Sequence, residues 1–514
     1  MEINTEQRLA QLIMGSTSNP LMTDGYKFSM AQAGFPLREE TFYFTCRKGE
    51  PLYIPFDLKA VVNEFLPRRL PNGKERAFLA THGYGLTPAM EEALLGRVDI
   101  WCPRPGSWVL PGEPILTITG PSFLVSWLEP LVICLNFPLQ VATTLQHIQS
   151  SGDRKADAMT NWACLRPSCS DELKILRLLE EKVGISRPDN LNYEQTYQKN
   201  ALQRVSAIRS ALKGDTSRAF EVGMRAMTCM QQHELALKAC QQVGITKTSN
   251  VYLAWKLYMM PVGTTGHEHQ MRWSAGNIGE DEPGFRAIRD MRQEPPSYLF
   301  DTYDPMEIGL PAAFKVIDET PERPCSLRFD SGDQDAQMGM VSHFFMPRQG
   351  AFPNTIFEDG YTAAKTTINE DFCDQKNWPT ERRFYGYGGH IVHDPHLNPF
   401  GRNRVSAAYK LCQSGGMPVM KFSGSSGKES LPGKPVIMRR VPTDGRKGPV
   451  SLVAQQGEEI EGFFDIGSVK SERRFLFLPP FPGQEGWTSS EWTKDLIINL
   501  TDMCILKGKR PCPS

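Results

Sequence analysis

The chain has 514 residues, with 57 Lys and Arg against 58 Asp and Glu, so its formal net charge is −1. This balance argues against a nucleic-acid-binding protein, which normally carries a basic excess. The hydrophobic fraction of 40% is ordinary for a globular protein, and no run of 18 apolar residues occurs, so we expect neither a transmembrane helix nor a membrane partner.

The first residues are polar and acidic and do not resemble a signal peptide, so we expect a cytoplasmic protein. The 12 cysteines are scattered, and the closest pair, Cys164 and Cys169, has no second pair or histidine to complete a zinc pattern. Reduced thiols are the simplest interpretation.

Residues 1–150 are of mixed character. Alternating residues predict a strand over 40–46, and a Pro-Gly turn at 111–114 leads into a second strand at 115–119. Apolar residues at helical spacing predict a long buried helix over 123–148. Residues 151–200 are polar and irregular, and we interpret them as an insertion of unknown role.

Residues 201–400 alternate helical segments with short apolar runs that each end in a polar loop. The runs are at 298–300, 326–329, 355–357 and 383–385. This rhythm predicts an α/β fold with parallel strands. In an α/β barrel the loops after the strands carry the active site, so we expect the site in this region.

Residues 401–514 are rich in strand and turn signals. We expect antiparallel strands over 418–422 and 435–438, paired with the N-terminal strands. The prediction is therefore a composite α+β terminal domain made from residues 1–150 and 401–514, with the α/β part between them.

Two loops are candidates for binding a sugar or a phosphate group. Asp330 and Asp333 lie in an acidic turn after a predicted strand, where carboxylates can accept bonds from sugar hydroxyls or hold Mg²⁺. Gly388 and Gly389 lie in a glycine-rich turn that lets backbone N–H groups approach a phosphate. Each loop could also be an ordinary turn.

Three further side chains could act on a substrate. His267 and His269 are two residues apart, which does not fit a helical zinc pair, so proton transfer or nucleophilic work suits His267 better. Arg225 could clamp a phosphate or carboxylate, or form a surface salt bridge. Tyr26 could stack on a flat ring, or be a buried structural residue. Loop histidines at 390, 393 and 396 are not interpreted as a metal site.

In chain order, these segments resemble the nicotinate and nicotinamide phosphoribosyltransferases, the type II phosphoribosyltransferases. The resemblance rests on an ordered set of motifs: Thr23–Lys27, Phe42–Lys48, Pro111–Phe137, Gly223–Arg225, Thr248–Val251, Gly263–Glu268, Asp301–Asp304, Arg328–Asp333, Tyr409–Leu411, Lys421, and Gly427-Lys428 to Pro432-Gly433. Each motif is short, but the order is specific.

The resemblance implies homodimers with shared active sites, an irregular α/β barrel and a composite terminal domain. It implies transfer of phosphoribose from 5-phosphoribosyl 1-pyrophosphate to a pyridine nitrogen, with Mg²⁺, pyrophosphate as leaving group and ATP as co-substrate. The product is a mononucleotide for NAD synthesis. The transition state should resemble an oxocarbenium ion, so catalysis should rest on positioning and charge stabilisation.

Residue roles also follow from the resemblance. ATP would phosphorylate His267, Asp330 would hold the ribose hydroxyls, and Arg328 would cover the pyridine. The remaining implied contacts are Arg225 at the ring and its carboxylate, Tyr26 stacking in the partner subunit's site, Asp359, Gly360, Gly388 and Gly389 around the 5′-phosphate and ribose, Arg402 on a phosphate, and Asp333 on Mg²⁺.

The sequence departs from the family's pattern in two places, and the family includes enzymes for two different bases. Val222 stands where the family usually has a ring-stacking Phe, and residues 152–200 match no family segment. Ser249 occupies the position where the nicotinamide branch has a carboxylate, which would repel nicotinate, so nicotinate is favoured. The alternatives are a nicotinamide-using enzyme and a non-catalytic nucleotide-binding protein.

Overall fold

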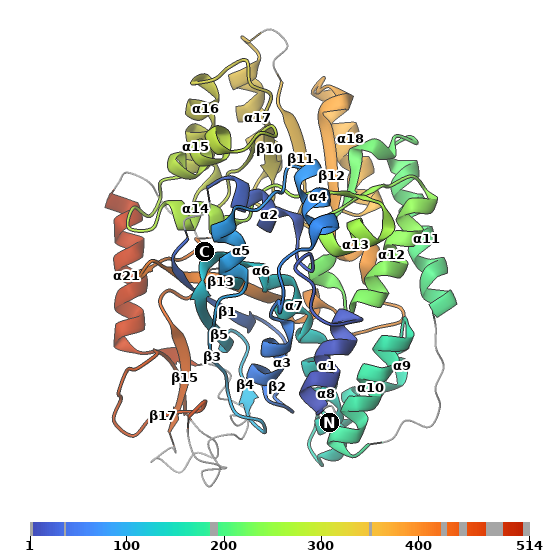
Figure 1. Ribbon diagram of the computed structural model, residues 1–514, viewed down its shortest axis with the longest axis vertical. Coiled ribbons are helices and arrows are strands. Elements are labelled where there is room, and N and C mark those ends of the chain that lie inside the picture. Colours follow the sequence, from blue (N-terminus) through green and yellow to red (C-terminus); the bar gives the residue numbers. More distant parts are fainter. Residues whose placement is uncertain are drawn as a thin grey trace.

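The computed structural model describes residues 4–34, 37–185, 194–348, 352–422, 429–440, 450–468 and 487–506. Figure 1 shows two main sheets surrounded by helices, with α15, α16 and α17 at the upper left of the view and α11, α12 and α18 at the right. The motif residues Gly427 and Lys428 lie outside the described residues.

A seven-stranded sheet has the order β8-β7-β6-β12-β11-β10-β9. Its neighbouring strands pair in parallel throughout, which confirms the α/β fold expected for residues 201–400. The strands are β6 (Ala219–Glu221), β7 (Lys247–Thr248), β8 (Met260–Pro261), β9 (Ser297–Leu299), β10 (Ser326–Phe329), β11 (Asn354–Phe357) and β12 (Arg383–Tyr387).

Helices connect these strands, as parallel pairing requires. The helix after β6 begins only at Met230, because a 3₁₀ turn at Met224–Ala226 precedes it. The helices are α12 (Met230–Gln242), α13 (Val251–Leu257), α14 (His267–Trp273), α15 (Glu282–Met291), α16 (Leu310–Asp318), α17 (Gln334–Phe345), α18 (Ala363–Gln375), α19 (Gly389–Val392) and α20 (Arg402–Val405).

A five-stranded antiparallel sheet joins the two ends of the chain. Its order is β14-β13-β1-β5-β3, and the strands are β1 (Glu39–Cys46), β3 (Asp99–Trp101), β5 (Pro114–Pro121), β13 (Ala407–Ser414) and β14 (Met417–Pro418). Phe44 of β1 lies opposite Tyr409 of β13. The N-terminal strand thus has a C-terminal partner, which contains the Tyr409–Leu411 motif.

The predicted C-terminal strands were wrong in detail. Residues 419–422 form no strand, and β15 (Pro435–Arg440) pairs with β16 (Val450–Gln455) and β17 (Phe464–Asp465) instead of the N-terminal strands. That four-stranded sheet is completed by β18 (Thr488–Ser489), and a small pair joins β2 (Leu52–Tyr53) to β4 (Trp108–Val109). The hydrophobic run at 435–438 suits burial in either sheet, so composition could not choose between them. The domain boundaries stay predictions.

The long apolar segment after β5 is the centre of the core. It forms three successive helices, α6 (Ser122–Trp127), α7 (Glu129–Cys134) and α8 (Asn136–Gln149). By length and composition alone the stretch is apolar enough to cross a membrane, with a mean hydropathy of 1.5 in its most apolar window. That whole window is buried inside the fold, as in the core helix of a soluble protein.

The segment interpreted as an insertion is helical in its described part. It comprises α9 (Lys155–Cys164), α10 (Ser170–Val183) and the start of α11 (Glu194–Ala211), and these helices pack on α8 and α12. The remaining helices are α1 (Thr5–Met14), α2 (Gly25–Gln32), α3 (Leu58–Phe65), α4 (Gly73–Thr81), α5 (Pro88–Leu94) and α21 (Glu491–Leu506).

Candidate active site

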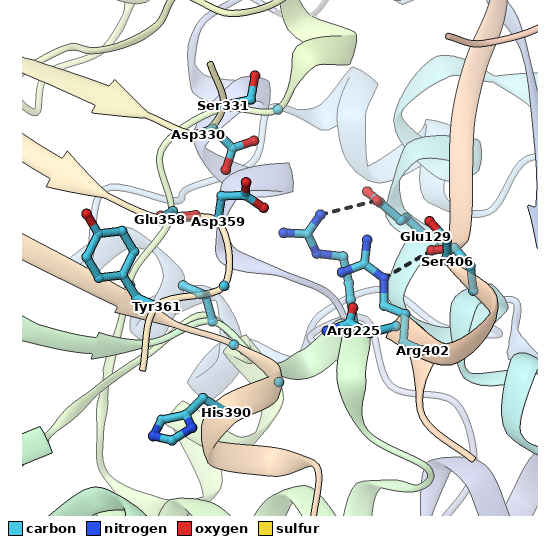
Figure 2. A pocket seen from close by; sticks show the side chains of 18 of the residues that line it. Glu129, Arg225, Asp330, Ser331, Glu358, Asp359, Tyr361, His390, Arg402 and Ser406 are labelled. Carbon is cyan, nitrogen blue, oxygen red and sulfur yellow. Dashed lines mark hydrogen bonds and ion pairs between the residues drawn. The ribbon is translucent and has the colours of Figure 1, made fainter. Parts of the chain in front are cut away.

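A cavity of about 1060 Å³ opens at the carboxyl ends of the parallel strands. Strands β10, β11 and β12 are neighbours, so the polar residues that follow them gather at one edge of the sheet. The other wall comes from α7, α20 and β13, and therefore from outside the α/β part. In Figure 2, Asp330, Glu358 and Asp359 lie on one side of the cavity and Arg225 and Arg402 on the other.

His267 lies in the cavity wall at the first position of α14. Its Nε2 is 2.8 Å from Lys421 Nζ and 3.3 Å from Asp330 Oδ2, and its Nδ1 is 3.6 Å from Asp301 Oδ1. Burial lowers the pKa of His267, and the neighbouring Lys421 lowers it further. The imidazole is therefore neutral at pH 7 and has a lone pair available.

His269 has a different environment. It is buried away from the cavity, and its Nε2 lies 3.0 Å from the Gly284 carbonyl oxygen. On an α-helix, residues two apart point in nearly opposite directions, which separates His269 from His267. The helix thus removes the ambiguity between the two histidines that an extended loop would have left.

Asp330 and Arg328 lie together at the end of β10. Arg328 Nη2 is 3.3 Å from Asp330 Oδ1 and 3.0 Å from Glu358 Oε2, and its Nη1 donates to the Thr265 carbonyl. Burial raises the pKa of Asp330, but Arg328, His267 and Lys421 outweigh it and hold that pKa well below its ordinary value. Asp330 is therefore a fixed negative charge in the cavity.

A second group, here called the ring wall, consists of Tyr26, Arg225, Glu129 and Asp24. The Arg225 guanidinium lies over the Tyr26 ring, 5.4 Å from its centroid, and 3.7 Å from Glu129 Oε1. Arg225 Nε is 3.5 Å from Asp24 Oδ2, and the Tyr26 hydroxyl donates to Glu129. These long contacts leave Arg225 able to bind an additional carboxylate.

Tyr26 lines the cavity of its own chain. That it also stacks in the partner subunit's site stays a prediction. The backbone around Asp24 and Gly25 pairs with Ser249 and Asn250, which brings α2 to the cavity of the same chain. Two segments far apart in the sequence thus build one wall.

Ser249 does not line the cavity, which corrects the expectation that it faces the substrate ring. It is buried behind the wall, and its hydroxyl lies next to Asp24. Burial raises the pKa of Asp24 to about 6 despite Arg225 and Ser249. Ser249 can thus reach a substrate only indirectly, through Asp24 and Arg225. Val222, the unusual residue before Gly223, does line the cavity.

Arg402, expected on a phosphate, lies in a cationic wall whose other members, Arg47 and Lys410, had been assigned no role from the sequence. Arg47, Arg402 and Lys410 line the cavity together with Ser406, to which the Arg47 guanidinium donates at 3.1 Å. Burial lowers the pKa of Lys410 to about 7, and Lys421 and Arg47 add to this effect. Burial also lowers the pKa of Arg402 to about 10, with Arg225 as the next cause. Partly buried cations crowded together in this way indicate an anion-binding site.

The predicted glycine loops are in the cavity. Gly360, Gly388 and Gly389 line it with Asp359. Asp359 and Gly360 have φ values of +72° and +70°, a left-handed turn that exposes successive backbone N–H groups. This geometry suits the phosphate contact expected of them.

Among the described residues, His267, Asp301 and Asp330 form a group that could hold a divalent cation. Ligand atoms of His267, Asp301 and Asp330 lie within 4.8 Å of one another. Mg²⁺ prefers oxygen ligands, so Asp301 and Asp330 are the suitable pair. Asp333 has another role, because its carboxylate caps α17 by accepting from Asp335 N and Ala336 N at 3.1 Å, and it does not line the cavity. Asp301 was visible in a motif but was assigned no role.

The relatives found by comparison with known proteins share one name, nicotinate phosphoribosyltransferase. The chain is 23% identical over 469 residues to the nicotinate phosphoribosyltransferase of Homo sapiens, covering 86% of this chain and 80% of that protein. It is 24% identical over 457 residues to the bovine (Bos taurus) protein of the same name, covering 84% and 78%. No protein-family model matches the chain.

Solved structures agree on the fold. The nicotinate phosphoribosyltransferase of Porphyromonas gingivalis superposes with a TM-score of 0.55 at 17% identity, covering 80% of this chain and 96% of that one. That of Vibrio cholerae gives 0.53 at 16% identity, covering 82% and 92%. The fold is that of the type II phosphoribosyltransferases. The chain is a relative of the nicotinate phosphoribosyltransferases, which confirms the resemblance found in the motifs.

Proposed function

We propose that this chain is a nicotinate phosphoribosyltransferase, which forms nicotinate mononucleotide and pyrophosphate from nicotinate and 5-phosphoribosyl 1-pyrophosphate for NAD synthesis. The observation that carries the proposal is one cavity with three chemical surfaces: the ring wall, the cationic wall and the acidic residues Asp330, Glu358 and Asp359. These suit a ring carboxylate, a pyrophosphate and a ribose, respectively.

The chemistry follows from these charges. The pyridine nitrogen forms a bond to C1 of the ribose while the C1–O bond to pyrophosphate breaks. Positive charge then grows on the ribose, next to the fixed negative charge of Asp330, and negative charge grows on the leaving group, which Arg47, Arg402 and Lys410 would stabilise. Arg225 would bind the ring carboxylate with Tyr26 beside it, which supplies an aromatic surface where Val222 cannot.

ATP coupling through His267 is part of the proposal. If Nδ1–H faces Asp301, the Nε2 lone pair can attack the γ-phosphorus of ATP, and the bond to ADP breaks. Lys421, 2.8 Å from Nε2, would stabilise the phosphoryl charge. Water would later take the phosphoryl group and restore the histidine.

Mg²⁺, the homodimer and a cytoplasmic location are proposed with it. Asp301 and Asp330 would hold Mg²⁺, which would neutralise substrate phosphate charge when bound. The homodimer and the location rest on the resemblance and the sequence alone.

Nicotinate is the proposed base because Arg225 offers a cation for its carboxylate. One assay separates the alternatives: purified protein receives nicotinate or nicotinamide with 5-phosphoribosyl 1-pyrophosphate and Mg²⁺, with and without ATP. Nicotinate mononucleotide as the main product is expected. Preference for nicotinamide would identify the other branch, and binding without turnover would identify a non-catalytic protein.

A further inference from the structure

A chain of alternating buried charges runs from the ring wall to the helix that begins at His267. Lys27, on α2, has no exposed side-chain surface, and its Nζ is 2.5 Å from both Glu129 Oε2 and Glu268 Oε1. Glu129 also faces Arg225, at 3.7 Å. Glu268 directly follows His267 on α14. Among the described residues, Lys27 is therefore the one cation that lies close to both Glu129 and Glu268.

The far end of this chain is fixed firmly. Glu268 Oε1 also accepts from Ser126 Oγ at 2.9 Å, and its Oε2 is 3.7 Å from Arg272. Arg272 in turn makes two 2.8 Å bonds to Glu40 in β1. Glu268 is held in place by these contacts. If Glu129 moves and Lys27 moves with it, the bond between Lys27 and Glu268 therefore strains the first turn of α14.

At the other end of this series of ion pairs, Arg225 is held by longer contacts. Arg225 contacts its two carboxylates only at 3.5 and 3.7 Å. A substrate carboxylate that binds Arg225 would compete with Glu129 for the guanidinium. Glu129 would then interact more strongly with Lys27. The resulting shift of Lys27 would alter its ion pair with Glu268 and the position of the start of α14. Ring binding and His267 geometry are thus connected through ion pairs in a low-dielectric interior, where such interactions are strong.

We propose that Lys27 is a positioning residue that couples occupancy of the ring wall to the placement of His267. The coupling is reciprocal, so a change at His267 must alter ring-substrate affinity to the same degree. This inference rests on the proposed function, because it takes nicotinate as the ligand of Arg225. It assigns Lys27 no contact with substrate, since Lys27 does not line the cavity.

A double-mutant cycle tests the coupling. Steady-state kinetics for nicotinate and for 5-phosphoribosyl 1-pyrophosphate are measured in the wild type, Lys27→Met, His267→Asn and the double variant. Lys27→Met should raise the nicotinate KM about tenfold, within the usual range of coupling between sites. It should leave the KM for 5-phosphoribosyl 1-pyrophosphate nearly unchanged, because the cationic wall is not part of this series of ion pairs. The two substitutions should be non-additive by at least about fivefold in kcat/KM for nicotinate.

Lys27→Arg keeps the charge and guards against a Met variant that does not fold. Its planar head cannot hold both carboxylates in the same geometry, so it should show the same non-additivity at lower amplitude. Arg218→Met is the matched control, because it removes a buried cation 2.8 Å from Glu370, outside the cavity lining. It should lower stability while remaining additive with His267→Asn.

The outcomes distinguish a failure of the coupling through Lys27 from a failure of the proposed function. If Lys27 and His267 substitutions are additive within about twofold, or if Arg218→Met shows the same non-additivity, the coupling through Lys27 is wrong. If the wild type makes no mononucleotide from nicotinate, the proposed function fails instead.

Discussion

At the scale of single residues, Asp330 has the clearest chemical role. Asp330→Asn keeps the shape but removes the charge beside the ribose. A hydrogen bond to a charged group is worth about 1.5–3 kcal/mol, so we expect kcat/KM to fall by about 10- to 100-fold in a folded protein. Asp333→Asn on the same loop is the control, because Asn also caps helices well. Equal losses in both variants would contradict the assignment.

Asp24 should make nicotinate binding depend on pH. Its pKa is raised to about 6, chiefly by burial, and it lies 3.5 Å from Arg225. Below pH 6 the carboxyl is protonated and leaves Arg225 to the substrate, whereas above pH 6 its charge competes with and repels the substrate carboxylate. We therefore expect the nicotinate KM to rise between about pH 5.5 and 7. Asp24→Asn should flatten this dependence, and an unchanged profile would contradict the explanation.

His267 should carry a phosphoryl group after exposure to ATP. With ATP labelled at the γ-phosphate, we expect an acid-labile label on the wild type that nicotinate with 5-phosphoribosyl 1-pyrophosphate discharges. His267→Asn should lose the label and the stimulation by ATP while keeping some ATP-independent transfer, because ribose and pyrophosphate contacts come from other loops. Labelling that survives in His267→Asn, or turnover indifferent to ATP, would exclude this role.

At the scale of elements, the approach of α2 to the strand-end loops depends on a glycine. A Cβ at Gly263 would overlap the backbone of Gly25 and Tyr26. Gly263→Ala should therefore push α2 from the ring wall, raise the nicotinate KM and lower Tm. Gly339→Ala within α17 meets no atom within 4 Å and should be neutral or stabilise by about 0.5–1 kcal/mol. Similar thermal and kinetic effects in both variants would contradict the close-approach argument.

At the scale of the whole molecule, the two chain ends depend on each other. Strand β1 lies between β5 and β13, so a fragment of residues 1–400 loses one side of its sheet and Lys410 and Lys421 of the cavity. We expect this fragment to lack a cooperative thermal transition by circular dichroism, and co-expression of residues 401–514 to restore it. Cooperative unfolding of the fragment alone would show that the α/β part folds independently.

The local features of the fold could be predicted from the order of residue types along the chain. Apolar runs followed by acidic or glycine-rich loops predicted β10, β11 and β12 and the places of Asp330, Gly360 and Gly388. His267 was also identified from its motif. These predictions succeeded because parallel strands put their following loops at one edge, whatever the details of packing.

The ion pairs of the site could not be predicted in this way, because their partners come from distant segments of the chain. Arg47 and Lys410 join the cavity because β1 and β13 pair, and Lys27 reaches Glu268 across 241 residues of sequence. Ser249 and Asp333 had suitable chemistry, but the fold placed one behind Asp24 and used the other to cap α17. Side-chain chemistry is local, whereas burial and the choice of ion-pair partner depend on long-range packing, and spacing along the chain does not specify it.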